Sequence, residues 1–257
     1  MQTRLVIEHI SNWLKDYANS SNNQGFVIGI SGGIDSAVTS TLAAKSHLLS
    51  LICVEMPIHQ NRNQTKRAVE HINWLKKNFS NISSIKIDLS SVFDEFVSTM
   101  PPSKKNKLAL ANTRARLRMT TLYYLAQTNN SLVLGTGNKV EDFGIGFFTK
   151  YGDGGVDISP IADLTKSEVR ELAKFCKIDN AIIQAAPTDG LWDDGRTDET
   201  QIGATYQELE WAMNLRNIRN LTTKEQNIVD IYNKLNNQNK HKMMPIPICQ
   251  IPKILKT

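Results

Sequence analysis

The chain has 257 residues and a formal net charge of +5 at pH 7, with 40% hydrophobic and 21% charged residues. This length can bury a sizeable core, and because no linker or composition break divides it, we expect one domain over residues 1–257. The cysteines form no Cys-x-x-Cys pair, so neither a zinc knuckle nor a redox dithiol is indicated. The basic residues are scattered without interleaved aromatics, and we therefore expect small polyanionic substrates and no nucleic-acid partner.

The first predicted element is a helix over residues 3–18. Charged residues interrupt its apolar positions, which is typical of neither a signal peptide nor a membrane span. We therefore expect a cytoplasmic protein with no membrane partner. The apolar side chains predicted to share one face of this helix are Leu5, Val6, Ile10, Trp13, Leu14 and Tyr17.

Apolar runs at 26–30, 49–55, 84–87 and 131–135 alternate with helical patterns at 35–46, 64–78 and 106–127. Because the runs are almost continuously apolar, they predict an α/β fold, in which a doubly wound, mostly parallel sheet has helices on both faces. Ligands of such sheets bind beyond the carboxyl ends of the strands. Helical patterns at 166–176, 200–215 and 223–238 predict a helical C-terminal extension.

The first strand leads into a glycine pair and a helix start, in the sequence Ser31-Gly32-Gly33-Ile34-Asp35-Ser36. Glycines that adopt positive φ and the free N–H groups of a helix start form a site for phosphate. No Gly-Lys-[Ser/Thr] follows, so this is not a Walker A loop. A carboxylate would repel phosphate unless a divalent cation lay between them, which makes Asp35 a candidate Mg²⁺ ligand. An ordinary turn with an N-capping Asp is the alternative for the glycine pair alone.

Two later segments could add charge to this site. Arg114 and Arg118 share a helix face, where their repulsion favours an anionic partner, although a solvated basic face is an equal alternative. The segment Gly135-Thr136-Gly137-Asn138 is followed by Glu141 and Asp142, and either carboxylate could complete a Mg²⁺ site with Asp35. An ordinary turn before a capped helix also explains this second segment.

Residues 146–157 combine aromatic, glycine, lysine and aspartate residues in a pattern that suits neither helix nor strand. Such a segment is either a mobile loop or a site, and its aromatics favour a site. Residues 189–198 have the glycines of a lid, with Leu191 and Trp192 to seal it. A disordered connector is the alternative there.

Taken together, the motifs resemble those of the ammonia-dependent NAD synthetases, which belong to the N-type ATP pyrophosphatases. The resemblance spans residues 25–242, and its most specific part is Phe147-Phe148-Thr149-Lys150-Tyr151-Gly152-Asp153-Gly154-Gly155. It implies an adenine nucleotide alpha hydrolase-like fold and a homodimer. It also implies a Mg²⁺-dependent ligase that amidates nicotinic acid adenine dinucleotide (deamido-NAD) to NAD. ATP is the co-substrate, and an acyl-adenylate forms before AMP and pyrophosphate are released.

The resemblance also assigns residues to roles. The candidate catalytic residues are Asp35, which the resemblance gives as a metal ligand, Lys166, whose charge could stabilise pyrophosphate, and Asp153, which we hypothesise accepts the ammonia proton. Implied metal ligands are Asp35 and Glu141, with Asp142 as the alternative because the spacing to Lys150 is one residue longer than in the family pattern. The implied ATP site is Gly29, Ile30, Ser31, Gly32, Gly33, Ile34, Asp35, Ser36, Thr136, Lys166 and Thr188. The implied deamido-NAD site is Arg116, Lys150, Asp157, His241 and Lys242.

Other functions remain open at this stage. A GMP synthetase core or a tRNA thiolation enzyme shares the phosphate loop, but the latter would need paired cysteines or a nucleic-acid surface. A regulatory nucleotide-binding module would need neither the metal pair nor Lys150 and Asp153. The length leaves no room for a glutamine-using domain, so ammonia is the expected nitrogen source. The apolar faces of the helices at 1–18 and 106–127 are candidate dimer contacts.

Overall fold

The computed structural model describes residues 1–46, 49–60, 62–101, 107–188, 190–192, 195–215 and 220–256. Within these residues, four parallel strands form one sheet in the order β3-β2-β1-β4. Their bounds are Gly25–Gly29 for β1, Ser50–Glu55 for β2, Ile82–Lys86 for β3 and Ser131–Val133 for β4. A parallel bridge between Leu134 and Ile158 extends the edge beyond β4.

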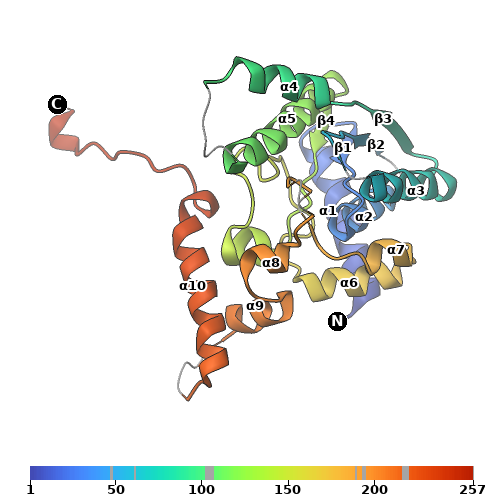
Figure 1. Cartoon of the computed structure of the whole chain (residues 1–257). Helices are drawn as coiled ribbons and strands as arrows, with labels where there is room; N and C mark the ends of the chain where they lie inside the picture. The colour runs from blue at the N-terminus through green and yellow to red at the C-terminus, as the bar shows by residue number, and fades with distance from the viewer. Residues whose placement is uncertain are drawn as a thin grey trace.

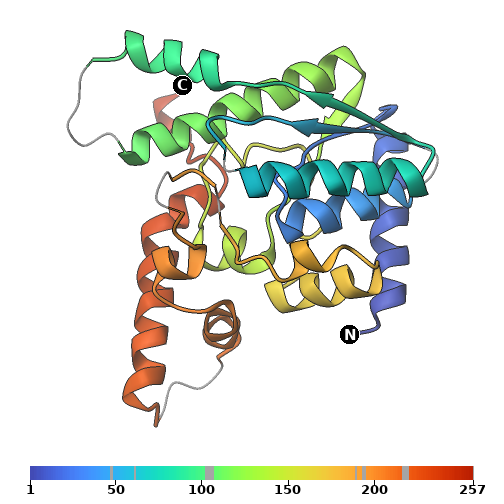
Figure 2. The same ribbon diagram turned by 45° about the vertical axis from the view of Figure 1, so that its right-hand side comes forward.

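Helices cover both faces of the sheet, as the sequence predicts (Figures 1 and 2). Phe26 and Ile28 of β1 pack in a cluster with α1 (Thr3–Ser20), α2 (Ile34–Ala44), α3 (Arg62–Asn78) and α6 (Lys166–Phe175). Val27 of β1 and Val54 of β2 pack on the opposite face against α4 (Ser90–Thr99) and α5 (Lys107–Thr128). Successive strand residues are therefore buried on alternate faces, which explains the continuous apolar runs.

The helical extension has a hydrophobic cluster of its own. It joins the π-helix η1 (Lys139–Ile145) to α8 (Asp198–Ile202), α9 (Tyr206–Met213) and α10 (Thr223–Met243). The sequence predicts one helix over 200–215, and this is wrong: Gly203, at φ +86°, ends α8, and Thr205 caps a new helix. The shorter elements are α7 (Asn180–Ile183) and η2 (Lys253–Leu255).

Two other differences concern helices. The helix α4 is not predicted, although Val92, Phe93, Phe96 and Val97 have the apolar spacing of a helix. The predicted face of α1 is half wrong, since Leu5, Trp13 and Tyr17 are exposed while Ile7, Ile10 and Leu14 are buried. No helix within the described ranges is long and apolar enough to cross a membrane.

Candidate active site

The loop between β1 and α2 has the geometry of an anion site. Gly32 adopts φ +79°, and a Cβ there would lie 2.4 Å from the backbone oxygen of Gln64. Gly33 instead has φ −95° and serves as the N-cap of α2. Only the first glycine of the pair therefore requires the left-handed conformation.

The hydroxyls of the loop form a preformed set of hydrogen bonds. Ser31 Oγ and Ser36 Oγ lie 3.1 Å apart, and Ser31 Oγ accepts a hydrogen bond from the Gly33 N–H at 3.2 Å. Ser36 Oγ donates to the Gly33 carbonyl at 3.0 Å, and Arg67 Nε donates to the Gly32 carbonyl at 3.0 Å. The loop conformation is thus held by side chains from both α2 and α3 before any ligand binds.

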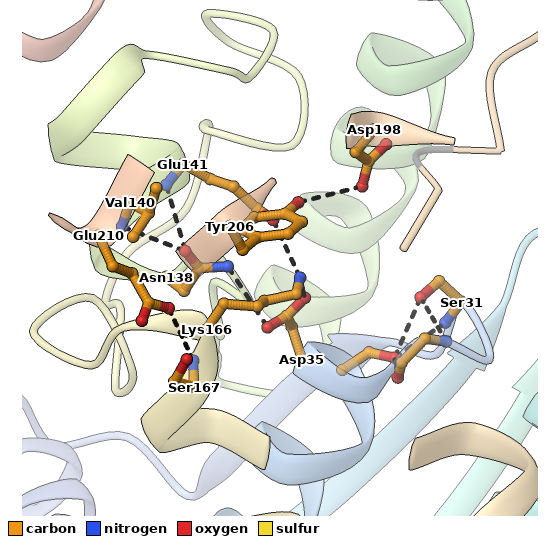
Figure 3. A network of polar contacts seen from close by, with 12 residues as sticks. Ser31, Asp35, Asn138, Val140, Glu141, Lys166, Ser167, Asp198, Tyr206 and Glu210 are labelled. Atoms are coloured by element: carbon orange, nitrogen blue, oxygen red, sulfur yellow. Dashed lines mark hydrogen bonds and ion pairs between the residues drawn. The ribbon is translucent and has the colours of Figure 1, made fainter. Parts of the chain in front are cut away.

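A buried ammonium group joins the phosphate loop to the helical extension (Figure 3). Lys166 Nζ lies 2.5 Å from Asp35 Oδ2 and 2.9 Å from Glu141 Oε1, and the Lys166 side chain is 2% exposed. Asn138 Nδ2 donates to Asp35 Oδ1 at 3.4 Å. Two carboxylates from distant parts of the sequence therefore converge on one positive charge.

Asp35, Glu141 and Lys166 change one another's pKa values. Burial raises the pKa of Asp35 above its usual value, and Glu141 adds to this effect, although the ammonium of Lys166 opposes it. Burial alone would also raise the pKa of Glu141, but Lys166 and the hydrogen bond from Tyr206 lower it overall. Burial disfavours the charged form of Lys166, yet the two carboxylates outweigh burial and raise its pKa. Lys166 is therefore an ammonium at neutral pH.

Three members of the site are missed by the sequence analysis, namely Asn138, Asp198 and Tyr206. Tyr206 OH donates to Glu141 Oε1 at 2.5 Å and lies 3.3 Å from Asp198 Oδ2. Burial and these carboxylates raise the pKa of Tyr206, so the phenol keeps its proton and remains a donor. Asn138 is the last residue of the segment Gly135-Thr136-Gly137-Asn138, and its role as the N-cap of η1 could have identified it. No sequence pattern marks Asp198 or Tyr206.

Helix caps place the central side chains. Thr165 forms a capping box with Glu168, which starts α6 at Lys166. Thr205 forms a second capping box with Glu208, which starts α9 at Tyr206. Both site residues are thus the first residue of a helix that begins at a fixed point.

Asp35, Glu141, Lys166 and Asp198 line a cavity of about 280 Å³ beyond the carboxyl ends of β1, β2 and β4. Met56, Leu122 and Val156 form part of its apolar wall. Twelve of the sequence-predicted site residues line it: Gly29, Ile30, Ser31, Gly33, Ile34, Asp35, Ser36, Thr136, Glu141, Asp153, Lys166 and Thr188. The expected ATP site is thereby brought together around one cavity, with Gly32 holding the loop conformation behind it.

The cavity has a strongly acidic wall. Asp142 and Asp153 line it together with Asp35 and Glu141. Burial and the three neighbouring carboxylates raise the pKa of Asp142 to about 8. Burial also raises the pKa of Asp153, although the Thr149 N–H donates to its carboxylate at 3.0 Å. Among the described residues no group of three or more His, Cys, Asp or Glu side chains is arranged to hold a metal.

The residues expected to contact deamido-NAD lie outside this cavity. Arg116 donates to the Lys150 carbonyl at 3.3 Å, and Lys150 Nζ donates to the His241 carbonyl at 2.8 Å. Lys242 Nζ donates to the Phe148 carbonyl at 2.7 Å. These four residues therefore gather around residues 146–155, on α5 and the end of α10.

Asp157 is separate from that group. Its carboxylate accepts hydrogen bonds from the Val133 N–H at 2.8 Å and from Tyr123 OH at 3.0 Å. These contacts hold the end of β4 against α5.

Arg114 and Arg118 both donate hydrogen bonds at the edge of the cavity. Arg118 donates to the Met56 carbonyl at 3.0 Å and to Gln60 Oε1 at 2.7 Å, and it lines the cavity. Arg114 donates to the Leu191 carbonyl at 3.0 Å, and Leu191 also lines the cavity. Within the expected lid, residues 189, 193 and 194 lie outside the described residues.

Comparisons with known proteins show the family to which this chain belongs. The sequence profile of the family described as NAD synthase matches residues 6–245. An NH(3)-dependent NAD(+) synthetase of Mesoplasma florum is 42% identical over 82% of this chain and 84% of its own length. The solved structure of an NMN synthetase from Francisella tularensis has a TM-score of 0.85 and 32% identity, and covers 98% of this chain and 100% of its own. An NH3-dependent NAD synthetase from Campylobacter jejuni has a TM-score of 0.78 and 26% identity over 97% of this chain and 100% of its own. The family suggested by the sequence motifs is confirmed, and the chain belongs to the NAD synthase family.

Proposed function

We propose that this protein is an ammonia-dependent NAD synthetase that acts as a cytoplasmic homodimer. The observation that carries the proposal is the convergence of the phosphate loop, Asp35, Glu141 and Lys166 on one cavity. A regulatory module would need the loop but not a buried ammonium between two carboxylates. The names of the family and of the relatives support the same activity.

The cavity supports binding of ATP. Residues 29–36 would hold the phosphates, Thr136 and Thr188 would contact the nucleotide, and Lys166 would neutralise charge on the departing pyrophosphate. In the first step a carboxylate oxygen of the nicotinate ring attacks the α-phosphorus. The bond to the bridging oxygen of the β-phosphate breaks, and pyrophosphate leaves with that electron pair.

The residues fit a bound Mg²⁺. Asp35 and Glu141 already point carboxylate oxygens at one cationic atom, and Mg²⁺ needs only one or two carboxylates besides phosphate oxygens and water. When bound, the ion would supply positive charge to the leaving pyrophosphate. Because Glu141 shares Lys166 with Asp35, its geometry favours it over Asp142 as the second ligand.

The acidic wall supports the second step. The nitrogen of ammonia attacks the activated carbonyl carbon, AMP leaves with the electron pair of its C–O bond, and a proton passes to a base. We assign Asp153 as that base because its carboxylate lines the cavity and its pKa is raised by burial. Leu191 at the cavity wall would help to keep water from the acyl-adenylate.

The basic group outside the cavity supports an acceptor that is larger than the cavity. Arg116, Lys150, His241 and Lys242 would contact the part of deamido-NAD that extends beyond it. Asp157 would act there indirectly, by holding β4. Exposed apolar side chains on α1 and α5, including Leu5 (56%) and Leu108 (62%), support the homodimer.

A second acceptor is supported by one comparison. The Francisella tularensis protein, 32% identical over almost the whole chain, is named an NMN synthetase. Nicotinic acid mononucleotide carries the same carboxylate as deamido-NAD but lacks the second nucleotide. It would therefore make no contact with the basic residues outside the cavity, namely Arg116, Lys150, His241 and Lys242. Relatives with higher identity are named NAD synthetases, and we therefore favour the dinucleotide.

The test is amidation by the purified protein with Mg·ATP. Deamido-NAD and nicotinic acid mononucleotide are compared as acceptors, each with ammonium, with glutamine and with neither. We expect NAD from ammonium and a higher kcat/KM for the dinucleotide. Product from neither acceptor, with no exchange of labelled pyrophosphate into ATP, would contradict the proposal. A preference for the mononucleotide would select the second acceptor.

A further inference from the structure

The C-terminal end of η1 is held by side chains of α10, which lies beside it (Figure 1). Asn236 Nδ2 donates a hydrogen bond to the Gly144 carbonyl at 2.7 Å, and Asn239 Nδ2 donates one to the Ile145 carbonyl at 2.8 Å. The last carbonyls of a helix have no partner further along that helix. The two amides therefore complete the hydrogen bonding of the last two residues of η1.

These amides belong to a row of three donors on one face of α10. Asn236, Asn239 and Lys242 follow one another at three-residue intervals, and residues with this spacing are neighbours on a helix surface. Lys242 Nζ continues the row by donating to the Phe148 carbonyl at 2.7 Å. Asn237, on the same helix, is exposed, whereas the two amide donors are half-buried. The contacts therefore depend on position along α10 and not on its general richness in asparagine.

A close approach of the two backbones accompanies these hydrogen bonds. Gly146 follows η1 at φ +61°, and a Cβ at this position would lie 2.5 Å from Asn239 Cβ. Val140 and Ile145 belong to the cluster on which Leu235 of α10 packs. Apolar packing has no preferred direction, whereas a hydrogen bond has one. The two amides thus set the orientation of η1 on α10.

The orientation of η1 decides where the Glu141 carboxylate lies. At the start of η1, Asn138 Oδ1 accepts hydrogen bonds from the Val140 and Glu141 N–H groups at 3.2 and 3.1 Å. Glu141 Oε1 lies 2.9 Å from Lys166 Nζ, which also pairs with Asp35. Asp35 belongs to α2, which packs against the sheet and not against α10. The position of one carboxylate relative to the other therefore depends on how α10 holds the seven residues of η1.

We propose that Asn236 and Asn239 are positioning residues, which hold the Glu141 carboxylate where it binds a divalent cation together with Asp35. They act through the backbone of η1 and contact no substrate. Loss of either amide leaves a carbonyl of η1 unpaired, so the end of η1 moves to find another donor. This inference rests on the proposed function, in which the two carboxylates bind the cation that accompanies ATP.

Binding of Mn²⁺ tests the inference without turnover, because carboxylate sites that suit Mg²⁺ also suit Mn²⁺. Free Mn²⁺ is measured by electron paramagnetic resonance in the presence of protein and the non-hydrolysable analogue α,β-methylene-ATP. We expect Asn236→Leu and Asn239→Leu each to weaken Mn²⁺ binding roughly tenfold, the effect of losing about one hydrogen bond. The matched control is Asn237→Leu, which should bind Mn²⁺ as the unaltered protein does. Unchanged affinity in both variants, an equal loss in the control, or no Mn²⁺ binding by the unaltered protein would overturn the proposal.

Amidation at increasing Mg²⁺ separates positioning from a general loosening of α10. We expect the Mg²⁺ concentration at half-maximal rate to rise roughly tenfold in Asn236→Leu and Asn239→Leu, and excess Mg²⁺ to restore kcat. Thr222→Ala removes the N-cap of the same helix and should leave the Mg²⁺ dependence unchanged. A kcat that stays low in excess Mg²⁺, or an equal shift in Thr222→Ala, would overturn the proposal. No amidation by the unaltered protein would instead contradict the proposed function, and Mn²⁺ binding would then decide the inference alone.

Discussion

At the scale of single residues, Lys166 is the group on which the site depends most. It lies between Asp35 and Glu141, and nearly all of its surface is removed from water. Replacement by methionine would keep the volume but leave two carboxylates facing each other, and removal of one partner from a buried ion pair costs about 3–5 kcal/mol. We expect Lys166→Met to lower the free energy of unfolding by that amount at pH 7, measured by urea denaturation.

Lys139 supplies the control for this prediction. It pairs with Asp163 at 2.9 Å, but the Asp163 side chain is 96% exposed. An exposed pair contributes about 0–1 kcal/mol, so Lys139→Met should have little effect. Mg²⁺ should also raise the melting temperature of Lys166→Met more than that of the unaltered protein. Equal destabilisation by the two substitutions would show that Lys166 is not the buried partner described here.

Gly32 and Gly33 form a second matched pair. A side chain at Gly32 would require φ +79° and would place Cβ 2.4 Å from the Gln64 carbonyl, whereas at Gly33 the nearest atom is Ser31 Oγ at 3.3 Å. Left-handed backbone costs about 1–2 kcal/mol for a residue with a side chain, before the contact with Gln64 is counted. Gly32→Ala should therefore destabilise the protein by more than Gly33→Ala in thermal unfolding. The reverse order would contradict the loop geometry.

At the scale of elements, the sequence predicts what is local and misses what depends on packing between distant segments. The strand, glycine turn and helix around Asp35 follow one another in the sequence, so both the loop and its chemistry are predictable from it. The hydrogen bond from Tyr206 to Glu141 forms only because the first residue of α9 packs beside a residue that is far away in the sequence. Helix α4 is a different case, because Val92, Phe93, Phe96 and Val97 give it a local helical spacing that could have predicted it.

The capping boxes provide a test of how helix starts control the site. Thr165, Thr205 and Thr222 cap α6, α9 and α10 in the same way, but only the first two helices begin with a site residue. Substitution of each threonine by alanine should cost about 1 kcal/mol of stability. Thr165→Ala and Thr205→Ala should also lower kcat, because Lys166 and Tyr206 lose their fixed starting point. Thr222→Ala is the control, and an equal loss of kcat in all three would refute this link.

At the scale of the whole molecule, the site lies between two separately packed parts. Leu164 and Val169 belong to the cluster beneath the sheet, whereas Val140 and Tyr206 belong to the cluster of the helical extension. Lys166 and Asp35 belong to the first part, and the ion pair of Lys166 with Glu141 crosses to the second. Alternating strands and helices predict the first part from the sequence, but no pattern predicts how the extension is placed against it.

Acid should weaken the fold as a whole through His71. This residue is 3% exposed between α2 and α3, its Nε2 lies 2.9 Å from Ser40 Oγ, and burial lowers its pKa from 6.5 to about 4. Between these two values the unfolded chain binds a proton that the folded protein does not, so stability is complete above pH 6.5 and falls as the pH decreases towards 4. The loss should reach about 2 kcal/mol at pH 5. Urea denaturation at pH 7 and pH 5 measures it, with His71→Gln as the comparison because the amide has no proton to gain. If that variant loses as much stability on acidification as the unaltered protein, another group is responsible for the pH dependence.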